Sequence, residues 1–188
     1  MRTIIAFLIC TIFFSCNNKK TDNPVVVIKT AFGDIEIELY PKYAPKTVAA
    51  FLANVEKGLY KNSNFYRVIK NDDLDMQSNY GVVQGGIWPA KKEETIEIET
   101  TKQTGLTHVS GTISMARTTG EKATTEFFIC IGEQQLFNEG GENPADKQGF
   151  AAFGQVIKGM AVVRQIQNQK NNGDMFLNKI VINNIEKQ

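Results

Sequence analysis

The sequence predicts a mainly β protein whose strands close into a barrel. Short runs of β-branched and aromatic residues, or of alternating polar and apolar residues, recur along the chain and are separated by glycine, asparagine and other turn residues. Only two segments have the apolar periodicity of a helix, which is too few helices to cover both faces of a parallel sheet. A closed barrel therefore fits the pattern better than a parallel sheet.

The overall composition fits one globular domain and excludes several classes of function. The 188 residues are enough to bury a sizeable core, and 42% hydrophobic with 22% charged residues is typical of a folded chain. Lysine and arginine number 21 and aspartate and glutamate 20, so no excess of positive charge attracts a nucleic acid. The single histidine excludes metal sites that need two imidazoles, including the usual catalytic zinc sites.

The N-terminus has the features of an export signal. A basic residue precedes the apolar run Ile4–Phe14, which is shorter than the about 20 residues that a helix needs to span a bilayer. The run ends in Phe13-Phe14-Ser15-Cys16, which resembles the lipobox of a bacterial lipoprotein, with phenylalanine in place of the usual aliphatic residue. We therefore expect a lipoprotein signal peptide over 1–15, a lipid on Cys16 and a polar tether over 16–23. An ordinary cleaved signal or a buried strand are the alternatives.

Such an anchor would hold the folded domain, residues 24–188, at the cell envelope. We expect a lipid-anchored membrane protein that faces the periplasm or the cell surface. Cleavage removes Arg2 and no acidic residue, so the remaining chain is formally neutral and would attach through lipid rather than through a basic face. Cleavage also removes Cys10 and leaves Cys130 as the thiol of the folded part, where apolar neighbours indicate a buried small residue and not a nucleophile.

The first part of the domain predicts a hairpin followed by a helix. Val25–Lys29 is rich in β-branched residues, Asp34–Tyr40 alternates with period two, and Ala31-Phe32-Gly33 supplies the turn between them. Pro45 fits the first turn of the helix and Gly58 its C-terminal cap. Helical spacing gives this segment one apolar face, formed by Val48, Phe51, Leu52 and Val55.

The rest of the chain predicts more strands and a second short helix. The strand candidates are Phe65–Lys70, Val82–Gln84, Thr95–Glu99, Thr112–Ala116, Phe127–Ile131, Ala151–Val156 and Lys179–Ile185. The helix is expected to begin near Gly159 and to direct Met160, Val163 and Ile166 inward.

Several sequence blocks, taken in their order and spacing, resemble one enzyme family. The main blocks are Phe65-Tyr66-Arg67-Val68-Ile69, Val83-Gln84-Gly85-Gly86, Ser114-Met115-Ala116-Arg117 and Phe127-Phe128-Ile129. Supporting matches are Ala44-Pro45-Lys46-Thr47-Val48 and Phe153-Gly154-Gln155-Val156. Together they resemble the cyclophilin-type peptidyl-prolyl cis-trans isomerases over Val25 to Ile185.

This resemblance implies a fold and a reaction. The family fold is a closed eight-stranded antiparallel β-barrel capped by two α-helices, in agreement with the elements predicted above. The reaction is rotation about the peptide bond before a proline, in which no bond breaks, so neither a cofactor nor a metal is expected. The implied partners are Pro-containing segments of unfolded or exported proteins, and a monomer is sufficient for this chemistry.

The resemblance also assigns roles to individual residues. Arg67 takes the place of the catalytic arginine, and Gln84 is expected to hydrogen-bond the substrate backbone. Without the family, Arg67 would be interpreted as a surface cation and Gln84 as a polar strand end. The proline pocket is expected to be lined by Val82, Phe128, Leu136 and Phe150, which the sequence alone would place in the core. The segment that pairs with the extended peptide is formed by Ala116 and Arg117, with Thr118 beside them.

The chain departs from the family pattern at several places. The connection between Arg67 and Gln84 is unusually long, and Gly81 stands where most relatives have a phenylalanine that packs on the proline. Tyr80 supplies that ring if the loop shifts by one residue. Other departures are Ile87 for an aspartate, Glu126 for a glutamine and Leu136 for an aromatic residue.

Two other functions compete with the isomerase. A cyclophilin-like module without useful turnover would bind Pro-containing segments, and the long connection and altered aromatic favour it. A hydrolase around His108, Ser110 and Ser114 is the third reading, but no nucleophile-elbow pattern accompanies these residues, so His108 is expected to be structural.

Overall fold

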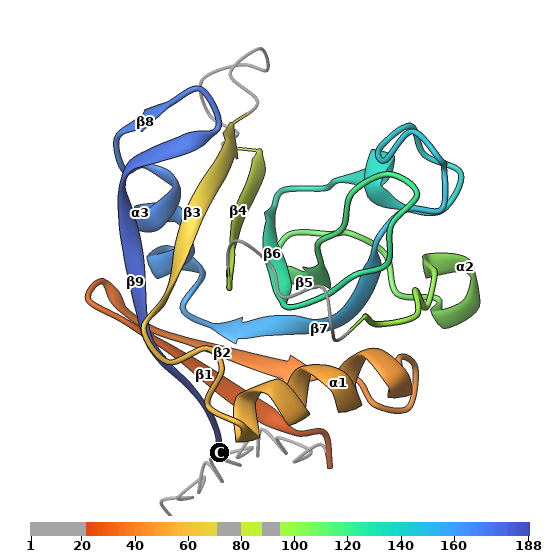
Figure 1. The fold of residues 1–188 in the computed structure, drawn as a ribbon, viewed down its shortest axis with the longest axis horizontal. Helices are drawn as coiled ribbons and strands as arrows, with labels where there is room; N and C mark the ends of the chain where they lie inside the picture. Colours follow the sequence, from red (N-terminus) through yellow and green to blue (C-terminus); the bar gives the residue numbers. More distant parts are fainter. Residues whose placement is uncertain (1–21, 71–79, 88–94) are drawn as a thin grey trace, which may run out of the picture.

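A ring of antiparallel strands forms the body of the protein (Figure 1). The computed structural model describes residues 22–70, 80–87 and 95–188. The strands of the ring are β1 (Val25–Thr30), β2 (Gly33–Leu39), β3 (Ser63–Lys70), β4 (Gly81–Gly86), β5 (Thr112–Met115), β6 (Glu126–Ile131), β7 (Ala151–Lys158) and β9 (Met175–Lys187).

The order of the strands shows that the barrel is closed. The order is β1-β2-β7-β5-β6-β4-β3-β9, and β9 also pairs with β1, so the described residues form the predicted eight-stranded antiparallel barrel. A two-residue strand, β8 (Asn171–Asn172), adds a short hairpin to β9. Closure leaves no long unpaired edge in this ring.

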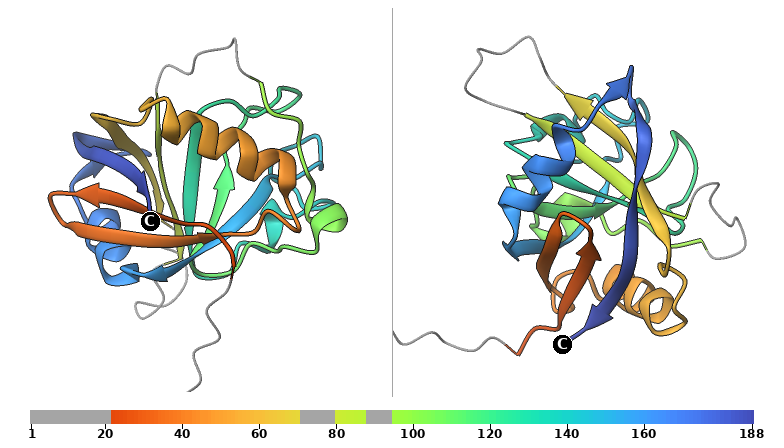
Figure 2. Two further views of the ribbon diagram at one scale, coloured as in Figure 1. Left: turned by 90° about the horizontal axis from the view of Figure 1, so that it is seen from below. Right: turned by 90° about the vertical axis from the view of Figure 1, so that its left-hand side faces the viewer.

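Two helices cover opposite sides of the barrel (Figure 2). These are α1 (Pro45–Glu56) and α3 (Met160–Gln167), and both begin where the sequence predicted. Gly58 follows α1 with a φ of 65°, the left-handed conformation that commonly ends a helix. The one-turn helix α2 (Thr101–Thr104) and the 3-10 turn η1 (Gln135–Phe137) were not predicted from the sequence.

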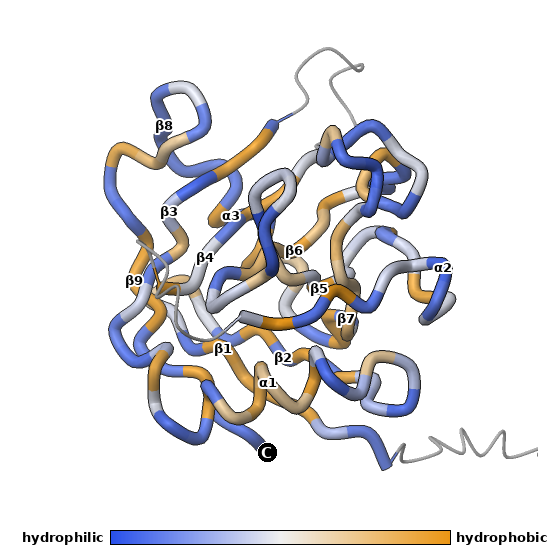
Figure 3. The backbone as a smooth tube through the Cα atoms, turned by 45° about the vertical axis from the view of Figure 1, so that its right-hand side comes forward, coloured by the Kyte–Doolittle hydropathy of each residue, from blue (hydrophilic) through white to orange (hydrophobic). Residues whose placement is uncertain are grey.

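The core lies inside the barrel and is filled by apolar side chains of the strands. Hydrophobic and hydrophilic residues alternate along these strands (Figure 3). In β2, for example, Ile35, Ile37 and Leu39 are completely buried. The helix α1 contributes Phe51, whose ring lies 5.0 Å from that of Phe153 between centroids. Burial of one such phenylalanine stabilises the fold by roughly 1.5–3 kcal/mol.

One predicted strand is wrong. Thr95–Glu99 forms only an isolated bridge from Ile96 to Ala123, because the chain then turns into α2 and does not continue along a neighbour. The remaining strand candidates and the hairpin around Ala31–Gly33 are confirmed, with ends that differ by a few residues.

The predicted export signal and the proposed lipid site at Cys16 lie outside the described residues. Within 22–70, 80–87 and 95–188, no helix combines the length and the apolar character needed to cross a bilayer. Cys130 is the free cysteine of this part of the chain, and it is buried as predicted.

Candidate active site

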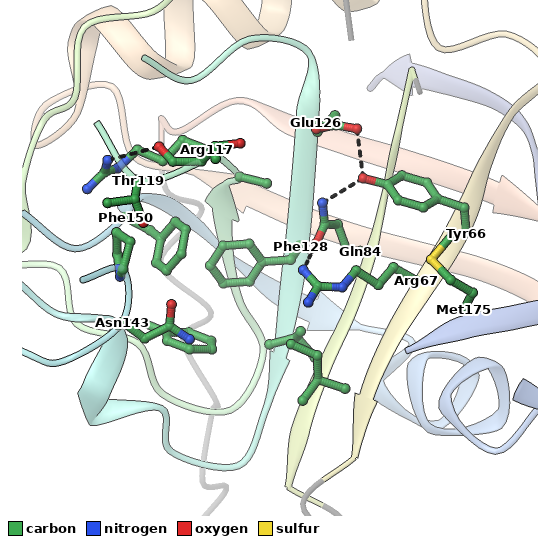
Figure 4. A pocket seen from close by; sticks show the side chains of 16 residues that line it. Tyr66, Arg67, Gln84, Arg117, Thr119, Glu126, Phe128, Asn143, Phe150 and Met175 are labelled. Carbon is green, nitrogen blue, oxygen red and sulfur yellow. Dashed lines mark hydrogen bonds between the residues drawn. The ribbon is translucent and has the colours of Figure 1, made fainter. Parts of the chain in front are cut away.

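A cleft of about 410 Å³ opens on one side of the barrel (Figure 4). One wall comes from β3 and β4, the floor from β6, and the opposite wall from the loops on either side of β6. The lining residues are Tyr66, Arg67, Ile69, Val82, Gln84, Ala116, Arg117, Thr118, Thr119, Glu126, Phe128, Phe137, Asn143, Pro144, Phe150 and Met175.

Strand register brings the main predicted residues into one row. Arg67 on β3 pairs with Gln84 on β4, and Gln84 pairs with Phe128 on β6. Paired residues in antiparallel strands direct their side chains to the same face. A cation, an amide and an aromatic ring therefore lie side by side across three strands, although 61 positions separate the first from the last.

A bulge in β3 adds a residue that sequence reasoning missed. The register of β3 shifts between Phe65 and Arg67, so Tyr66 and Arg67 both line the cleft although they are neighbours in the chain. In a regular strand, consecutive side chains would point to opposite faces. The alternation of a sequence gives no sign of such a shift, so Tyr66 was not expected in the site.

These side chains form one hydrogen-bonded series along the cleft wall. Asp174 Oδ2 accepts from Arg67 Nη2 at 2.8 Å, and Arg67 Nη1 donates to Gln84 Oε1 at 3.3 Å. Gln84 Nε2 donates to the Tyr66 hydroxyl at 2.6 Å, and that hydroxyl donates to Glu126 Oε1 at 2.7 Å. The series fixes which side of the Gln84 amide faces the arginine.

Burial changes the titration of the inner part of this series. It raises the pKa of the Tyr66 hydroxyl, and the hydrogen bond to Glu126 adds to that rise, so the tyrosine remains a donor. Burial also raises the pKa of Glu126, against the opposing effects of the Tyr66 hydrogen bond and the Arg67 charge. Both groups therefore lie in an environment with less water than the protein surface.

Three aromatic rings make the apolar part of the cleft. The ring centroids of Phe128 and Phe150 lie 5.1 Å apart, those of Phe128 and Phe137 5.5 Å, and those of Phe137 and Phe150 5.3 Å, all in edge-to-face contacts. Val82 and Ala116 pack with these rings, and buried Cys130 lies in the same cluster. Burial raises the pKa of the Cys130 thiol, which is therefore unreactive.

His108 lies behind this aromatic cluster and is 1% exposed. Its ring stacks on Phe128 at 5.9 Å, Nδ1 lies 2.8 Å from Asn138 Oδ1, and Nε2 lies 3.0 Å from Ser114 Oγ. Asn138 Oδ1 only accepts, so Nδ1 carries the proton and Nε2 accepts from the serine. Burial lowers the pKa of His108 to about 4, so a neutral ring supports the pocket. These contacts fit the structural role that the sequence predicts for His108.

Arg117 belongs to the opposite wall, but its charge is turned away from solvent. Its side chain is 1% exposed, and two of its nitrogens donate to Asp146 at 2.6 and 2.7 Å. It also donates to the carbonyl of Gly149 at 2.9 Å. These bonds hold the pKa of the Asp146 carboxyl well below its usual range. Arg117 thus joins the 117–121 and 143–150 loops, and exposed Thr118 and Thr119 face the cleft.

Leu136 is a correction to the expected pocket. It is 59% exposed and does not line the cleft, whereas the next residue, Phe137, is 8% exposed and does. The 3-10 turn over Gln135–Phe137 explains the difference, because consecutive residues of a tight turn point in different directions. Phe137 thus supplies the wall of the pocket that the sequence prediction assigned to Leu136, one position earlier.

Tyr80 is a second correction. It does not line the cleft; its ring covers Gly132, where a Cβ atom would come within 1.9 Å of Tyr80 Cδ1. Gly81 cannot carry a ring either, because its φ is 139° and a Cβ there would lie 1.9 Å from the Ile69 carbonyl oxygen. The apolar pocket is instead formed by Ile69, Val82 and the three phenylalanines described above.

The cleft combines a fixed cation with an adjacent apolar pocket. Arg67 is held at both ends of its guanidinium while its side chain remains 37% exposed. Such a site can grip a compact apolar ring and place a hydrogen-bond donor beside a polar atom at the edge of that ring. Among the described residues, no group of three or more metal-ligating side chains surrounds this cleft or any other place.

Comparison with known proteins gives a consistent match. Residues 25–187 match the sequence model of the family described as cyclophilin type peptidyl-prolyl cis-trans isomerase/CLD. A peptidyl-prolyl cis-trans isomerase of Acinetobacter baylyi is 35% identical over 150 residues, which are 78% of this chain and 73% of that protein. Peptidyl-prolyl cis-trans isomerase B of Escherichia coli is 33% identical over 146 residues, 76% of this chain and 84% of that one.

Solved structures agree on the fold. The crystal structure of a cyclophilin-type isomerase from Cryptosporidium parvum aligns with a TM-score of 0.70 at 22% identity, covering 88% of this chain and 98% of that one. The same protein in the presence of the dipeptide Ala-Pro aligns with a TM-score of 0.68 at 23% identity, covering 86% and 96%. At these identities the likeness concerns the barrel and its helices.

Proposed function

The chain belongs to the cyclophilin-type peptidyl-prolyl cis-trans isomerases, and from this premise we propose that the cleft in Figure 4 is its active site, with Arg67 as the catalytic group. The enzyme accelerates rotation about the peptide bond before a proline. One observation carries the assignment of the site: Arg67 and Phe128 line the same cleft and lie in the same cross-strand row, on the two strands that flank β4.

The reaction has a barrier of about 18–20 kcal/mol because the amide nitrogen lone pair is delocalised into the carbonyl. Uncatalysed exchange takes tens to hundreds of seconds. Turnover at about 10³ per second would require roughly a 10⁵-fold acceleration, or about 7 kcal/mol of transition-state stabilisation. At the 90° twist this delocalisation is lost and the nitrogen becomes pyramidal and basic, so a donor aimed at it stabilises the transition state more than the ground state.

Arg67 is suited to that role. A guanidinium stays charged at any ordinary pH, and its planar fork donates in several fixed directions. Two of those directions are taken by Asp174 and Gln84, which orient the group without covering it. The proline ring would sit against Phe128, Phe137 and Phe150, so that its nitrogen faces the remaining donors of the arginine.

Gln84 would hold the substrate backbone. Its Oε1 already accepts from Arg67 and one N–H already donates to Tyr66, which leaves the second N–H for a substrate carbonyl. The edge segment at Ala116 and the threonines after it would contact the extended part of the peptide. When the proline ring and the backbone before it are both held, the peptide bond that joins them can rotate.

The place of action is a further part of the proposal. We infer that the enzyme acts on exported proteins while lipid on Cys16 holds it at the cell envelope, as a monomer. Three features of the sequence support the export and the lipid anchor: the apolar run over Ile4–Phe14, the Ser15-Cys16 pair after it, and the polar residues that follow.

The role of Arg67 is tested by an X-Pro peptide isomerisation assay on the wild type and Arg67→Ala. Loss of a single transition-state donor costs about 10²–10³-fold in rate, and we expect a loss of that size in kcat/KM. Arg164→Ala is the matched control, because Arg164 is exposed on α3 and does not line the cleft. It should keep the wild-type rate.

Two results would reject this assignment. Equal rates for the wild type and Arg67→Ala would mean that another group acts on the amide. A wild type that binds the peptide but leaves its isomerisation at the uncatalysed rate would instead favour a module that only binds Pro-containing segments.

A further inference from the structure

Among the described residues, not every charged side chain of the cleft forms an ion pair. Arg67 forms an ion pair with Asp174, and Arg117 forms one with Asp146. Glu126 also lines the cleft, and it forms no ion pair with any lysine or arginine in the part of the chain that the structure describes. Its Oε1 accepts from the Tyr66 hydroxyl, a neutral donor. The cleft therefore presents a carboxylate to whatever binds there.

This carboxylate is partly buried, and burial opposes its charged form. An ionised group removed from water is unfavourable unless an opposite charge or hydrogen bonds compensate it. The Tyr66 hydroxyl compensates in part and also keeps the side chain directed along the cleft wall (Figure 4). A cation brought by the substrate would supply the rest of the compensation.

The position of Glu126 relative to the proline pocket sets where that cation must be. Glu126 and Phe128 are two residues apart on β6, so their side chains leave the same face of the strand about 6.6–6.8 Å apart. An extended peptide advances by about the same distance in two residues. With a proline on Phe128, a residue two positions away along the peptide would reach Glu126.

We propose that Glu126 is a specificity-determining residue that selects X-Pro segments with a lysine or arginine two positions from the proline. This inference rests on the active site proposed above and adds a class of substrate to it. Tyr66 acts as a positioning residue, because it holds Glu126 on one side and Gln84 on the other. Substrates with an acidic residue at the same place are disfavoured by repulsion.

The test uses two series of short peptides, each with one proline. In the first series the residue two positions before the proline is lysine, alanine or glutamate, and in the second series the residue two positions after it varies in the same way. Isomerisation is followed by NMR exchange, which needs no coupling protease. In one of the two series we expect kcat/KM to decrease in the order lysine, alanine, glutamate. The kcat/KM of the lysine peptide should be about tenfold higher than that of the glutamate peptide.

Glu126→Gln should reduce that ratio to less than about twofold, whatever it does to the absolute rates. Glu121→Gln is the matched control, because it changes the net charge equally at an exposed residue that does not line the cleft. It should keep the ratio. Salt at about 0.5 M should also reduce the wild-type ratio, because it screens the attraction.

Three outcomes separate the possibilities. A wild type that is active on all peptides without a charge order in either series overturns the role of Glu126 and leaves the active site intact. A charge order that survives in Glu126→Gln overturns it as well. A wild type that is inactive on every peptide overturns the proposed active site, and the specificity with it.

Discussion

Tyr66 and Arg67 are neighbours in the chain, yet both contribute to the cleft, because β3 changes register between them. This bulge thus places the guanidinium that we propose as the catalytic group beside the hydroxyl that orients Gln84 and Glu126. The family blocks in the sequence located Arg67, Gln84 and Phe128, which line the cleft and whose proposed roles depend on residue type at a fixed place. They did not reveal Tyr66, because a bulge is set by pairing with other strands.

His108 should make the stability of the protein depend on pH. Its pKa is lowered to about 4 in the folded state, against about 6.5 in an unfolded chain. Above pH 6.5 both states are neutral; as the pH falls below 6.5, only the unfolded state binds the proton, so stability is lost until about pH 4. Between pH 7 and 5 this loss amounts to about 2 kcal/mol.

Urea unfolding of the wild type and His108→Gln at several pH values measures this effect. The variant lacks the ring that packs on Phe128 and should be less stable throughout, but its stability should fall less between pH 7 and 5. Equal slopes for the two proteins would show that His108 does not titrate in this way. A wild type that becomes more stable on acidification relative to the variant would have the opposite sign and contradict the buried neutral ring.

At the scale of elements, the start of α1 depends on a residue far away in the chain. Ala44 at the N-cap has no side chain to accept hydrogen bonds, and Pro45 occupies the first turn. The carboxylate of Glu99 accepts instead from the backbone nitrogens of Lys46 at 3.2 Å and Thr47 at 2.8 Å. A negative group at the N-terminus of a helix also interacts favourably with the helix dipole.

Removal of this remote cap should destabilise the fold without changing the active site. Glu99→Ala leaves helix donors without an acceptor, and loss of a cap costs about 0.5–2 kcal/mol. Chemical denaturation should show a loss of that size, while the rate on an X-Pro peptide at a temperature well below unfolding stays near the wild type. Glu142→Ala, at an exposed glutamate, serves as the control. If Glu99→Ala is as stable as the control, the capping role is wrong.

The same contact explains why the strand predicted at Thr95–Glu99 is wrong. Alternating residues there are typical of a strand, but Glu99 points back to α1 and the next residues form α2. By contrast, α1 and the hairpin of β1 and β2 could be predicted, because local periodicity and turn residues specify them. Leu136 and Tyr80 were misassigned for a related reason: a tight turn and a close contact with Gly132, both set by tertiary packing, decide where those side chains point.

At the scale of the whole molecule, the first and last strands of the described part of the chain meet at one seam of the barrel. β1 pairs with β9, and the Gln188 nitrogen donates to the Val25 carbonyl at 2.9 Å, so the described part of the chain begins beside the place where it ends (Figures 1 and 2). The segment that would carry the lipid precedes this seam in the sequence. Acyl chains contribute about 0.8 kcal/mol per buried CH₂, which is enough for stable attachment when several chains are present.

Cys16→Ser tests the proposed anchor. We expect the wild type to take up labelled fatty acid and to sediment with membranes, and the variant to lose the label and to appear in the soluble fraction. Cys130→Ser is the matched control, since Cys130 is buried under the cleft and should not affect attachment. Continued acyl labelling of Cys16→Ser would contradict the anchor.

The most direct measurement separates binding from rotation at Arg67. NMR exchange on a saturating X-Pro peptide gives the rate of isomerisation on the protein, and a titration gives the Kd of the same peptide. If the fixed cation lowers the barrier while the aromatic pocket holds the ring, Arg67→Ala slows exchange on the protein by about 100-fold or more and changes the Kd by less than about threefold. An unchanged exchange rate with weaker binding would contradict the catalytic role of Arg67.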